Sequence, residues 1–369
     1  MDNFELNALT TQVLWAAFIL AALFGAIAQR THFCTMGAVS DIVTMGDWTR
    51  MRMWGMAVGV AMIGFYGLAA AGLIDPAKTL YASNRFIWLS ALVGGLLFGF
   101  GMVLTSGCGS KTLVRVGGGN LKSLVVLLVL GVAAFATLKG ITAVLRVATV
   151  DRVAIDFSSH AALSNWVAGL TGVSPALAGL VLAGVLGGGL ILWALAGPDF
   201  RRFDNLLAGL GIGAVIVGMW WVSGHMGYVA EHPDTLQEAF LATNSGRMEA
   251  LSFVSPVAYT VDWLMFFSDK SKLLTVGIVS VFGVVVGSAL YSLLSRSFRW
   301  EGFRDVEDTA NHLSGAVLMG VGGVIAMGCT VGQGLSGIST LSATSFVAVA
   351  AILAGSVAGV RYQVWRLEG

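Results

Sequence analysis

The sequence has few charged residues. Asp, Glu, Lys and Arg make up 11% of its 369 residues, whereas ordinary soluble domains carry about 25% to cover their cores with polar surface. This shortage excludes a soluble globular protein. The 21 Lys and Arg residues are balanced by 20 Asp and Glu residues, so no basic surface for nucleic-acid phosphates is expected. With 56% hydrophobic residues, the composition indicates a polytopic protein of the lipid bilayer.

Cysteine is also scarce. Cys34, Cys108 and Cys329 are odd in number and far apart, so they predict neither a disulfide scaffold nor a CxxC metal or redox site. The five histidines lack metal-binding spacing, and we expect no metal or other cofactor. No Asp or Glu lies in the middle of an apolar run, where a proton or sodium relay would need one. Downhill conduction is therefore the simplest energetic interpretation.

Apolar runs long enough to cross a bilayer, which takes roughly 20 residues, recur along the chain. We predict an all-α fold with about nine spans, near residues 11–29, 52–74, 87–106, 121–145, 174–197, 203–223, 273–295, 312–327 and 345–361. Four shorter pieces, at 33–45, 108–116, 251–267 and 329–338, are predicted to be re-entrant half helices. Lipid cannot satisfy interrupted backbone, so these pieces must be buried in protein or line a wet cavity.

An internal repeat relates the two halves of the chain. The stretch GGLLFGFGMVLTSGC (94–108) aligns without a gap with GAVLMGVGGVIAMGC (315–329), and residues 32–39 align more weakly with 252–259. Five crossings precede the second half, which therefore has the opposite orientation, as in many transporters. We predict one integral membrane domain over 1–369, with repeats at about 11–145 and 203–361 joined by a span at 174–197.

The distribution of Lys and Arg predicts the orientation in the membrane. Of the 21 basic residues, those near the ends of spans on one predicted side outnumber those on the other by 13 to 8. Because the richer side is usually cytoplasmic, we expect the N-terminus outside and the C-terminus in the cytoplasm.

Two Gly-Cys pairs, Gly107–Cys108 and Gly328–Cys329, stand at equivalent positions of the repeat, each at a predicted helix break. A break exposes N–H groups, and the following half helix aims its positive dipole end at the pathway, which favours an anion. Thiols are weak donors and weak acceptors, which suits a sulfur-containing substrate. Hydroxyl groups that could contact its oxygen atoms belong to Thr105, Ser106, Thr330 and Ser336. The structural alternative is that the cysteines and glycines only pack the helices.

The segment GCGSKT (107–112) ends like a nucleotide-binding P-loop. However, Ser110 replaces the glycine that precedes lysine in that motif, and no strand comes before it. We therefore expect no ATP binding.

Three cysteine-centred segments make the sequence similar to the YeeE/YedE family of bacterial inner-membrane sulfur-compound transporters. They are QRTHFCTMGAVSD (29–41), TSGCGSKTLVRVGGGN (105–120) and MGCTVGQGLSGIST (327–340), and the resemblance covers nearly the whole chain. It implies an hourglass-shaped importer of thiosulfate in which Cys34, Cys108 and Cys329 make successive S–H···S contacts with the substrate. It also implies a cytosolic TusA-like sulfurtransferase as a partner.

Three alternatives stay open. The chain could transport another sulfur or selenium species, or it could be a membrane thiol or persulfide enzyme that uses Cys108 or Cys329. An enzyme needs an activated thiol, yet neither Gly-Cys motif contains a histidine or another general base. A packing or assembly subunit would leave the repeated helix breaks without a role. We therefore expect a transporter rather than an enzyme.

Overall fold

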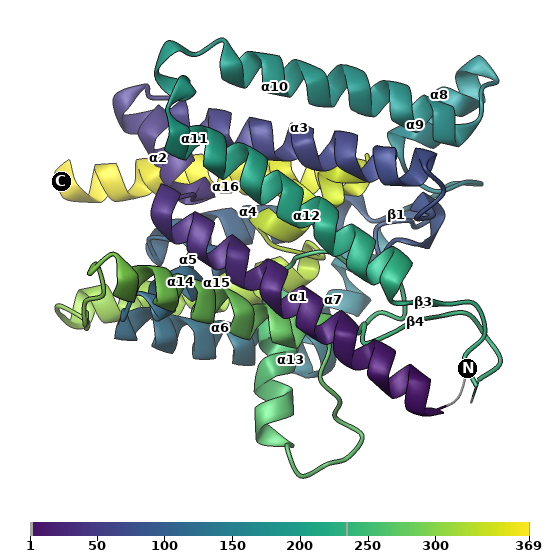
Figure 1. Cartoon of the computed structure of the whole chain (residues 1–369). Coiled ribbons are helices and arrows are strands. Elements are labelled where there is room, and N and C mark those ends of the chain that lie inside the picture. The colour runs from purple at the N-terminus through teal and green to yellow at the C-terminus, as the bar shows by residue number, and fades with distance from the viewer. Residues whose placement is uncertain (1–2, 234, 369) are drawn as a thin grey trace.

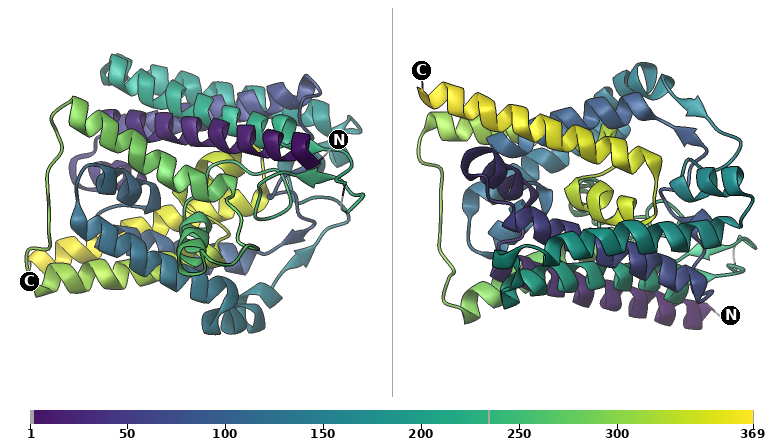
Figure 2. Two further views of the ribbon diagram at one scale, coloured as in Figure 1. Left: turned by 60° about the horizontal axis from the view of Figure 1, so that its bottom comes forward. Right: turned by 90° about the horizontal axis from the view of Figure 1, so that it is seen from above.

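The structure, a computed structural model, describes residues 3–233 and 235–368 and is predominantly helical. Within those ranges, eight helical segments are long and apolar enough to cross a membrane: residues 4–45, 49–70, 88–117, 121–139, 175–195, 203–226, 276–294 and 343–366. This confirms the predicted all-α polytopic membrane fold. The long helices run side by side, and the two ends of the described chain lie at opposite ends of the bundle (Figures 1 and 2). We call these ends the N-terminal face and the C-terminal face.

The first half of the chain supplies six helices. They are α1 (Asn3–Thr31), α2 (Thr35–Met45), α3 (Thr49–Ala70), α4 (Trp88–Leu104), α5 (Gly109–Gly117) and α6 (Leu121–Lys139). A connecting region follows, with α7 (Ile141–Ala148), α8 (Leu163–Thr171), α9 (Pro175–Leu182) and α10 (Gly188–Leu195). The π-helical turn η3 (Ala183–Gly187) joins α9 to α10 into the predicted linking span.

The second half begins with one continuous helical span that contains two π-helical turns. It comprises α11 (Phe203–Leu206), η5 (Leu207–Gly211), α12 (Ile212–Trp221) and η6 (Val222–Met226). The remaining helices are α13 (Val254–Met265), α14 (Val276–Leu294), α15 (Val306–Ile325), the π-helical η7 (Gly332–Gly337) and α16 (Ala343–Glu368). The second half thus repeats the order of long and short helices found in the first.

The expected span near 312–327 forms as part of α15, which is 20 residues long. The two N-terminal turns of α15 carry Glu307, Asp308 and His312, so this helix is less apolar than the eight segments above. By length and composition the described chain therefore has eight spans rather than about nine. α15 is a further long helix, packed against α4 and α6.

Short helices occupy all four positions predicted for them. α2, α5 and α13 are 11, 9 and 12 residues long, and η7 lies within a helical run over residues 330–339. In Figure 1, α13 lies across the direction of the neighbouring long helices. These pieces are too short to cross a bilayer.

Helix packing follows the pattern expected of two related halves. α1 packs on α14 while α3 packs on α12, and α4 packs on α16 while α15 packs on α6. An ion pair also recurs at the repeat offset, because Asp41 pairs with Arg50 at 3.2 Å and Asp262 pairs with Lys272 at 2.6 Å. These features favour the inverted repeat, which stays a prediction.

Three connections cover the N-terminal face. β1 (Arg85–Phe86), in the connection before α4, pairs antiparallel with β2 (Ile155–Asp156), in the connection before α8. β3 (Tyr228–Val229) pairs antiparallel with β4 (Ala239–Phe240) within the connection before α13. Both ladders lie at the end of the bundle that holds the start of α1 (Figure 1). The connection before α8 is also joined to the start of α16, since Ala343 N donates to Ala161 O at 2.9 Å. The loops therefore form a structured cap.

Candidate transport pathway at the helix breaks

The chain breaks in the same way before each cysteine. The residue two positions earlier has a left-handed backbone, with φ of 53° at His32, 55° at Ser106 and 57° at Met327. A left-handed residue ends an α-helix, and non-glycine residues adopt this conformation only at an energetic cost. A new short helical run begins directly after each thiol, at residues 35, 109 and 330. Three equivalent breaks therefore place Cys34, Cys108 and Cys329 at the starts of short helices.

Two of the thiols cap the helices that follow them. Gly37 N donates to Cys34 Sγ at 3.4 Å, and Gly332 N donates to Cys329 Sγ at 3.4 Å. The Cys108 thiol instead lies 3.2 Å from the Ser110 hydroxyl. Helix N-termini carry partial positive charge from unpaired N–H groups. The sulfur atoms therefore lie where an anion would be stabilised.

Cys108 is at the centre of the cluster. Its thiol interacts with the thiol of Cys34 and lies beside the Thr330 hydroxyl, and it is within electrostatic range of Cys329. The three cysteines are free thiols with exposed fractions of 6%, 1% and 0% for Cys34, Cys108 and Cys329. The fold thus gathers three cysteines that are far apart in the sequence.

The predicted pathway hydroxyls differ in their availability. Thr105 Oγ1 donates to Gly107 O at 2.8 Å, and Ser336 Oγ donates to Leu251 O at 2.7 Å, so both hold the backbone at the breaks. The Thr330 hydroxyl is buried without a hydrogen-bond partner among the described residues. Of these hydroxyls, that of Thr330 is the best placed to bind a substrate.

The two predicted glycines have different structural roles. Gly328 has φ of 156°, a conformation that L-residues with side chains rarely adopt. Gly107 has no such requirement, but a Cβ atom there would lie 3.2 Å from Lys111 Cγ. The Cys329 break therefore needs glycine for its backbone, whereas the Cys108 break needs it for space beside Lys111.

A polar cavity of about 480 Å³ reaches two of the breaks from the C-terminal face. It is lined by His32 and Ser106, the left-handed residues before Cys34 and Cys108, and by a group of cations: Lys111, Arg115, Lys122, Arg299 and Arg304. Glu301 and Asp308 are its acidic residues. Lys111 is within electrostatic range of both Cys34 and Cys108. This Lys111 cavity is suited to a small anion.

A second cavity, of about 250 Å³, reaches the third break from the N-terminal face. It is lined by Met327, the left-handed residue before Cys329, and by Tyr81, Arg146, Glu249 and Tyr259. The Glu249 carboxylate accepts from Ser245 N at 2.8 Å, and burial raises its pKa above the usual value. We call this the Glu249 cavity. The two cavities thus reach the helix breaks from opposite faces.

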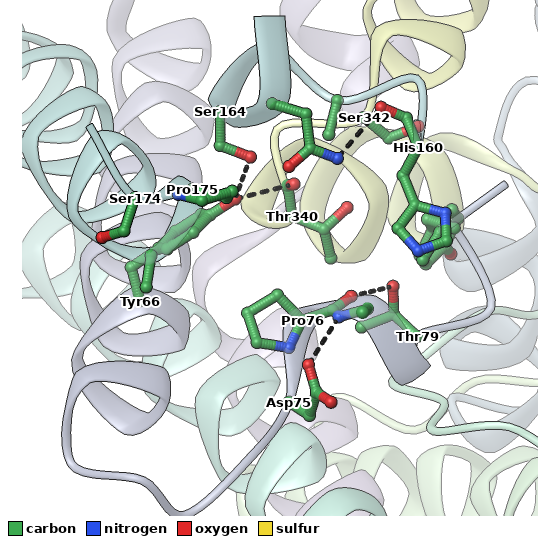
Figure 3. Close-up of a pocket in the computed structure, with 16 residues that line it drawn as sticks. Tyr66, Asp75, Pro76, Thr79, His160, Ser164, Ser174, Pro175, Thr340 and Ser342 are labelled. Carbon is green, nitrogen blue, oxygen red and sulfur yellow. Dashed lines mark hydrogen bonds between the residues drawn. The ribbon is translucent and has the colours of Figure 1, made fainter. Parts of the chain in front are cut away.

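A third cavity, of about 320 Å³, lies beneath the cap on the N-terminal face (Figure 3). Tyr66 Oη donates to Thr340 O at 3.1 Å and lies 3.4 Å from Ser164 Oγ. Tyr81 lines both this cavity and the Glu249 cavity. Many of its polar groups already bond within the protein, so we assign it a structural role beneath the cap.

The sequence missed several residues of the site. Lys111 was visible as part of the rejected P-loop motif, and Arg115 follows it by about one helical turn, a spacing that signals a shared face. Tyr81 and Trp54 carry no local signal, because long-range packing alone brings them to the breaks. Within the described chain, no cluster of three His, Cys, Asp or Glu side chains could hold a metal ion.

Short helices that start at buried thiols, between polar cavities on opposite faces of a membrane bundle, define a candidate membrane transporter. The comparison with known families supports this class. A family model described as Sulphur transport matches residues 30–358, so the chain belongs to that family. The predicted membership of the YeeE/YedE family is confirmed.

Individual relatives carry related names. Thiosulfate transporter TsuA of Escherichia coli K12 is 28% identical over 334 residues, which cover 88% of this chain and 87% of the relative. Thiosulfate transporter TsuA of Spirochaeta thermophila is 24% identical over 353 residues, covering 91% and 94% respectively. Probable transporter YedE of E. coli K12 is 29% identical over 110 residues, or 30% of this chain and 26% of the relative. The chain is accordingly a sulfur-compound transporter and not an enzyme.

Proposed function

We propose that the protein takes up thiosulfate through a pathway that runs from the Glu249 cavity past Cys329, Cys108 and Cys34 to the Lys111 cavity. The observation that carries the proposal is the meeting of three buried thiols at the starts of short helices, with a cavity reaching their breaks from each face. The names of the TsuA relatives support thiosulfate as the substrate.

The chemistry at the thiols favours passage over tight binding. A thiol donates a weak hydrogen bond, here to the terminal sulfur of thiosulfate, and short-helix N-termini add partial positive charge. Several weak, successive contacts let an anion enter a site and leave it again. In this mechanism no covalent bond to Cys34, Cys108 or Cys329 forms, which distinguishes transport from persulfide chemistry.

The proposed orientation places the N-terminal face outside the cell and the C-terminal face in the cytoplasm of a bacterium, across its inner membrane. The opposite positions of the two chain ends and the excess of basic residues on the C-terminal side support it (Figure 1). The Lys111 cavity would then release the anion to the cytoplasm. A TusA-like sulfurtransferase that consumes thiosulfate there would keep transport downhill.

Growth on thiosulfate tests the proposal. In a host that cannot assimilate sulfate, Cys108→Ala and Cys329→Ala should each abolish thiosulfate-dependent growth while the protein still reaches the membrane. Ser356→Ala, which changes a buried residue of α16 that lines none of the cavities described above, is the matched control and should grow normally. Normal growth of both cysteine variants would contradict the proposal.

Competition would refine the choice of substrate. Labelled thiosulfate uptake into liposomes should be inhibited more strongly by unlabelled thiosulfate than by sulfate, because sulfate has no terminal sulfur for the thiols to contact. Stronger inhibition by another sulfur or selenium anion would reassign the substrate and leave the pathway in place.

A further inference from the structure

An apolar cavity on the side of the bundle borders residues next to two of the cysteines. It has a volume of about 570 Å³ and lies between α3, the η3–α10 helix and α16. Its walls are almost entirely aliphatic and aromatic, and the side chains that carry nitrogen or oxygen atoms are Thr35, Trp54, Trp193 and Thr330. Thr35 follows Cys34 and Thr330 follows Cys329, so the cavity reaches the starts of two short helices.

Trp54 and Thr330 are more than nine-tenths buried, with exposed fractions of 6% and 2%. Trp54 Nε1 and Thr330 Oγ1 nevertheless have no hydrogen-bond partner among the described residues. Buried polar groups in folded proteins are nearly always paired, so each exception calls for an explanation. Because these two unpaired groups line the same cavity, one explanation should account for both.

The surroundings fix the Trp54 indole in place. Its ring stacks on Phe33, which precedes Cys34, with 5.8 Å between ring centroids and an interplanar angle of 12°. Its other edge lies against the η7 backbone, since a Cβ atom added at Gly334 would fall 2.3 Å from Trp54 Cη2. The indole is thus clamped between the Cys34 break and the Cys329 helix, and its unpaired N–H is held there.

We propose that Trp54 Nε1–H and Thr330 Oγ1–H are substrate-positioning donors that bind the oxygen atoms of the sulfur anion while its terminal sulfur contacts Cys108. This inference rests on the proposed function and adds Trp54 to the site. The two unpaired donors lie at one cavity, and the Thr330 hydroxyl lies beside the Cys108 thiol.

The chemistry of the substrate fits a site in which neutral donors bind its oxygen atoms and a thiol contacts its sulfur. An anion that enters a narrow route must give up water, and fixed neutral donors replace those hydrogen bonds without holding it as tightly as a buried cation would. Lys111, which does not line this cavity, interacts electrostatically with Cys108 and supplies the charge. The apolar wall of the cavity keeps water from competing for the two donors.

Substitutions that remove only the donor atoms test the inference in proteoliposomes. Trp54→Phe and Thr330→Val should each raise KM for thiosulfate about tenfold, the ratio typical of one lost hydrogen bond to a charged group. Vmax should change little, and the melting temperature without thiosulfate should be unchanged or higher, because no protein hydrogen bond is lost. Thr330→Ser, which restores the hydroxyl, should restore KM.

Two controls separate positioning from packing. Trp220 is equally buried, but its Nε1 donates to Ser339 Oγ at 3.0 Å, so Trp220→Phe should lower the melting temperature and leave KM unchanged. Ser356 Oγ is a buried unpaired hydroxyl outside the cavity, so Ser356→Ala should leave KM unchanged. The stabilisation by added thiosulfate should shrink only in the Trp54 and Thr330 variants.

Wild-type KM in both Trp54→Phe and Thr330→Val would overturn the inference, as would a bilayer lipid found seated on these donors in protein that still transports with unchanged KM. The proposed function would survive those results, because wild-type uptake and its loss in Cys108→Ala report on it separately. No thiosulfate uptake by the wild type would overturn both.

Discussion

The breaks at Cys108 and Cys329 are equivalent in the internal repeat but differ in chemistry. Three and seven residues after Cys108 lie Lys111 and Arg115, whereas Gly332 and Ser336 lie at the same positions after Cys329. The first break borders a cavity lined by cations, and the second is built from small neutral residues. The repeat has thus kept the backbone geometry of a helix break while the side chains around it have diverged.

The second break is held by a network of buried hydrogen bonds. Tyr81 Oη donates to Gly332 O at 2.5 Å, and Gln333 Nε2 donates to Ala326 O at 2.7 Å across the break itself. Ser345 Oγ donates to Gln333 Oε1 at 2.6 Å, which ties the helix after Cys329 to α16. Buried hydrogen bonds that join several segments fix one arrangement of the backbone. The Cys329 break is therefore rigid. We call this break, with the helical run over residues 330–339, the neck.

For the proposed pathway, this difference predicts that one end acts on the substrate by charge and the other by shape. At the Cys108 break, cations lower the energy of an anion over the width of a cavity. At the Cys329 break, we expect glycines and a fixed backbone to limit the size of the anion that can pass. Selectivity and release can then be changed independently. Substitutions at the two ends should therefore affect different measured properties of uptake.

The largest expected effect comes from removing the charge beside Cys108. Lys111→Gln should raise KM for thiosulfate by at least about tenfold, because the ammonium group attracts the dianion close to two thiols. The effect should be greatest at low ionic strength, where screening is weakest. Uptake into liposomes at two salt concentrations measures both.

Lys122→Gln is the matched control for Lys111→Gln. Lys122 lines the same cavity, but it pairs with Asp308 at 3.4 Å, and its removal should change KM less. Lys111→Arg should retain most of the wild-type affinity. Equal effects of the two glutamine variants would mean that only the net charge of the cavity matters and would remove the special role of the Cys108 break.

The sequence predicted the spans and short helices well because both depend on local composition and length. The positions of α2, α5, α13 and η7 could be predicted because a piece too short to cross, set between long apolar runs, has few other solutions in a bilayer. The helix boundaries shifted by a few residues, and α15 proved less apolar than expected because its acidic N-terminal turns extend the helix.

The side chains around the thiols could not be predicted in the same way. Cys34 and Cys108 meet through packing of segments 74 residues apart, and no periodicity in the sequence encodes that contact. Thr105 and Ser336 were expected to face substrate, yet each bonds a main-chain carbonyl, because a broken helix leaves such groups in need of partners. Hydroxyl type alone does not distinguish these two roles.

A smaller effect is expected from loosening the neck. Tyr81→Phe removes the hydrogen bond to Gly332 O and should increase the labelling rate of Cys329 by a methanethiosulfonate reagent about fivefold, the ratio for one typical hydrogen bond. The measurement uses protein in which Cys34 and Cys108 are replaced by alanine. Tyr66→Phe is the control, since Tyr66 bonds Thr340 O beyond the end of the same helix. An unchanged labelling rate in Tyr81→Phe would show that Tyr81 does not hold the neck closed.

The smallest expected effect is a pH dependence at the Glu249 cavity, where Arg146 is the lining Lys or Arg residue, in contrast to the group of cations in the Lys111 cavity. Burial raises the pKa of the Glu249 carboxyl, so this group becomes neutral at a higher pH than an exposed glutamate as the solution on the N-terminal face is acidified. Arg146 and the hydroxyls of Ser245, Tyr81 and Tyr259 surround it. Losing the negative charge should favour anion entry and raise uptake about two- to threefold.

Glu249→Gln should hold uptake at the higher rate at every pH and so flatten the pH dependence of uptake. Glu238 on the same face provides the contrast, because its hydrogen bond to Lys78 holds its pKa below the usual value and keeps it ionised across the same pH range. Glu238→Gln should therefore leave the pH profile unchanged. If Glu249→Gln kept the wild-type profile, the dependence would arise elsewhere, and the neck would select by shape with no contribution from charge.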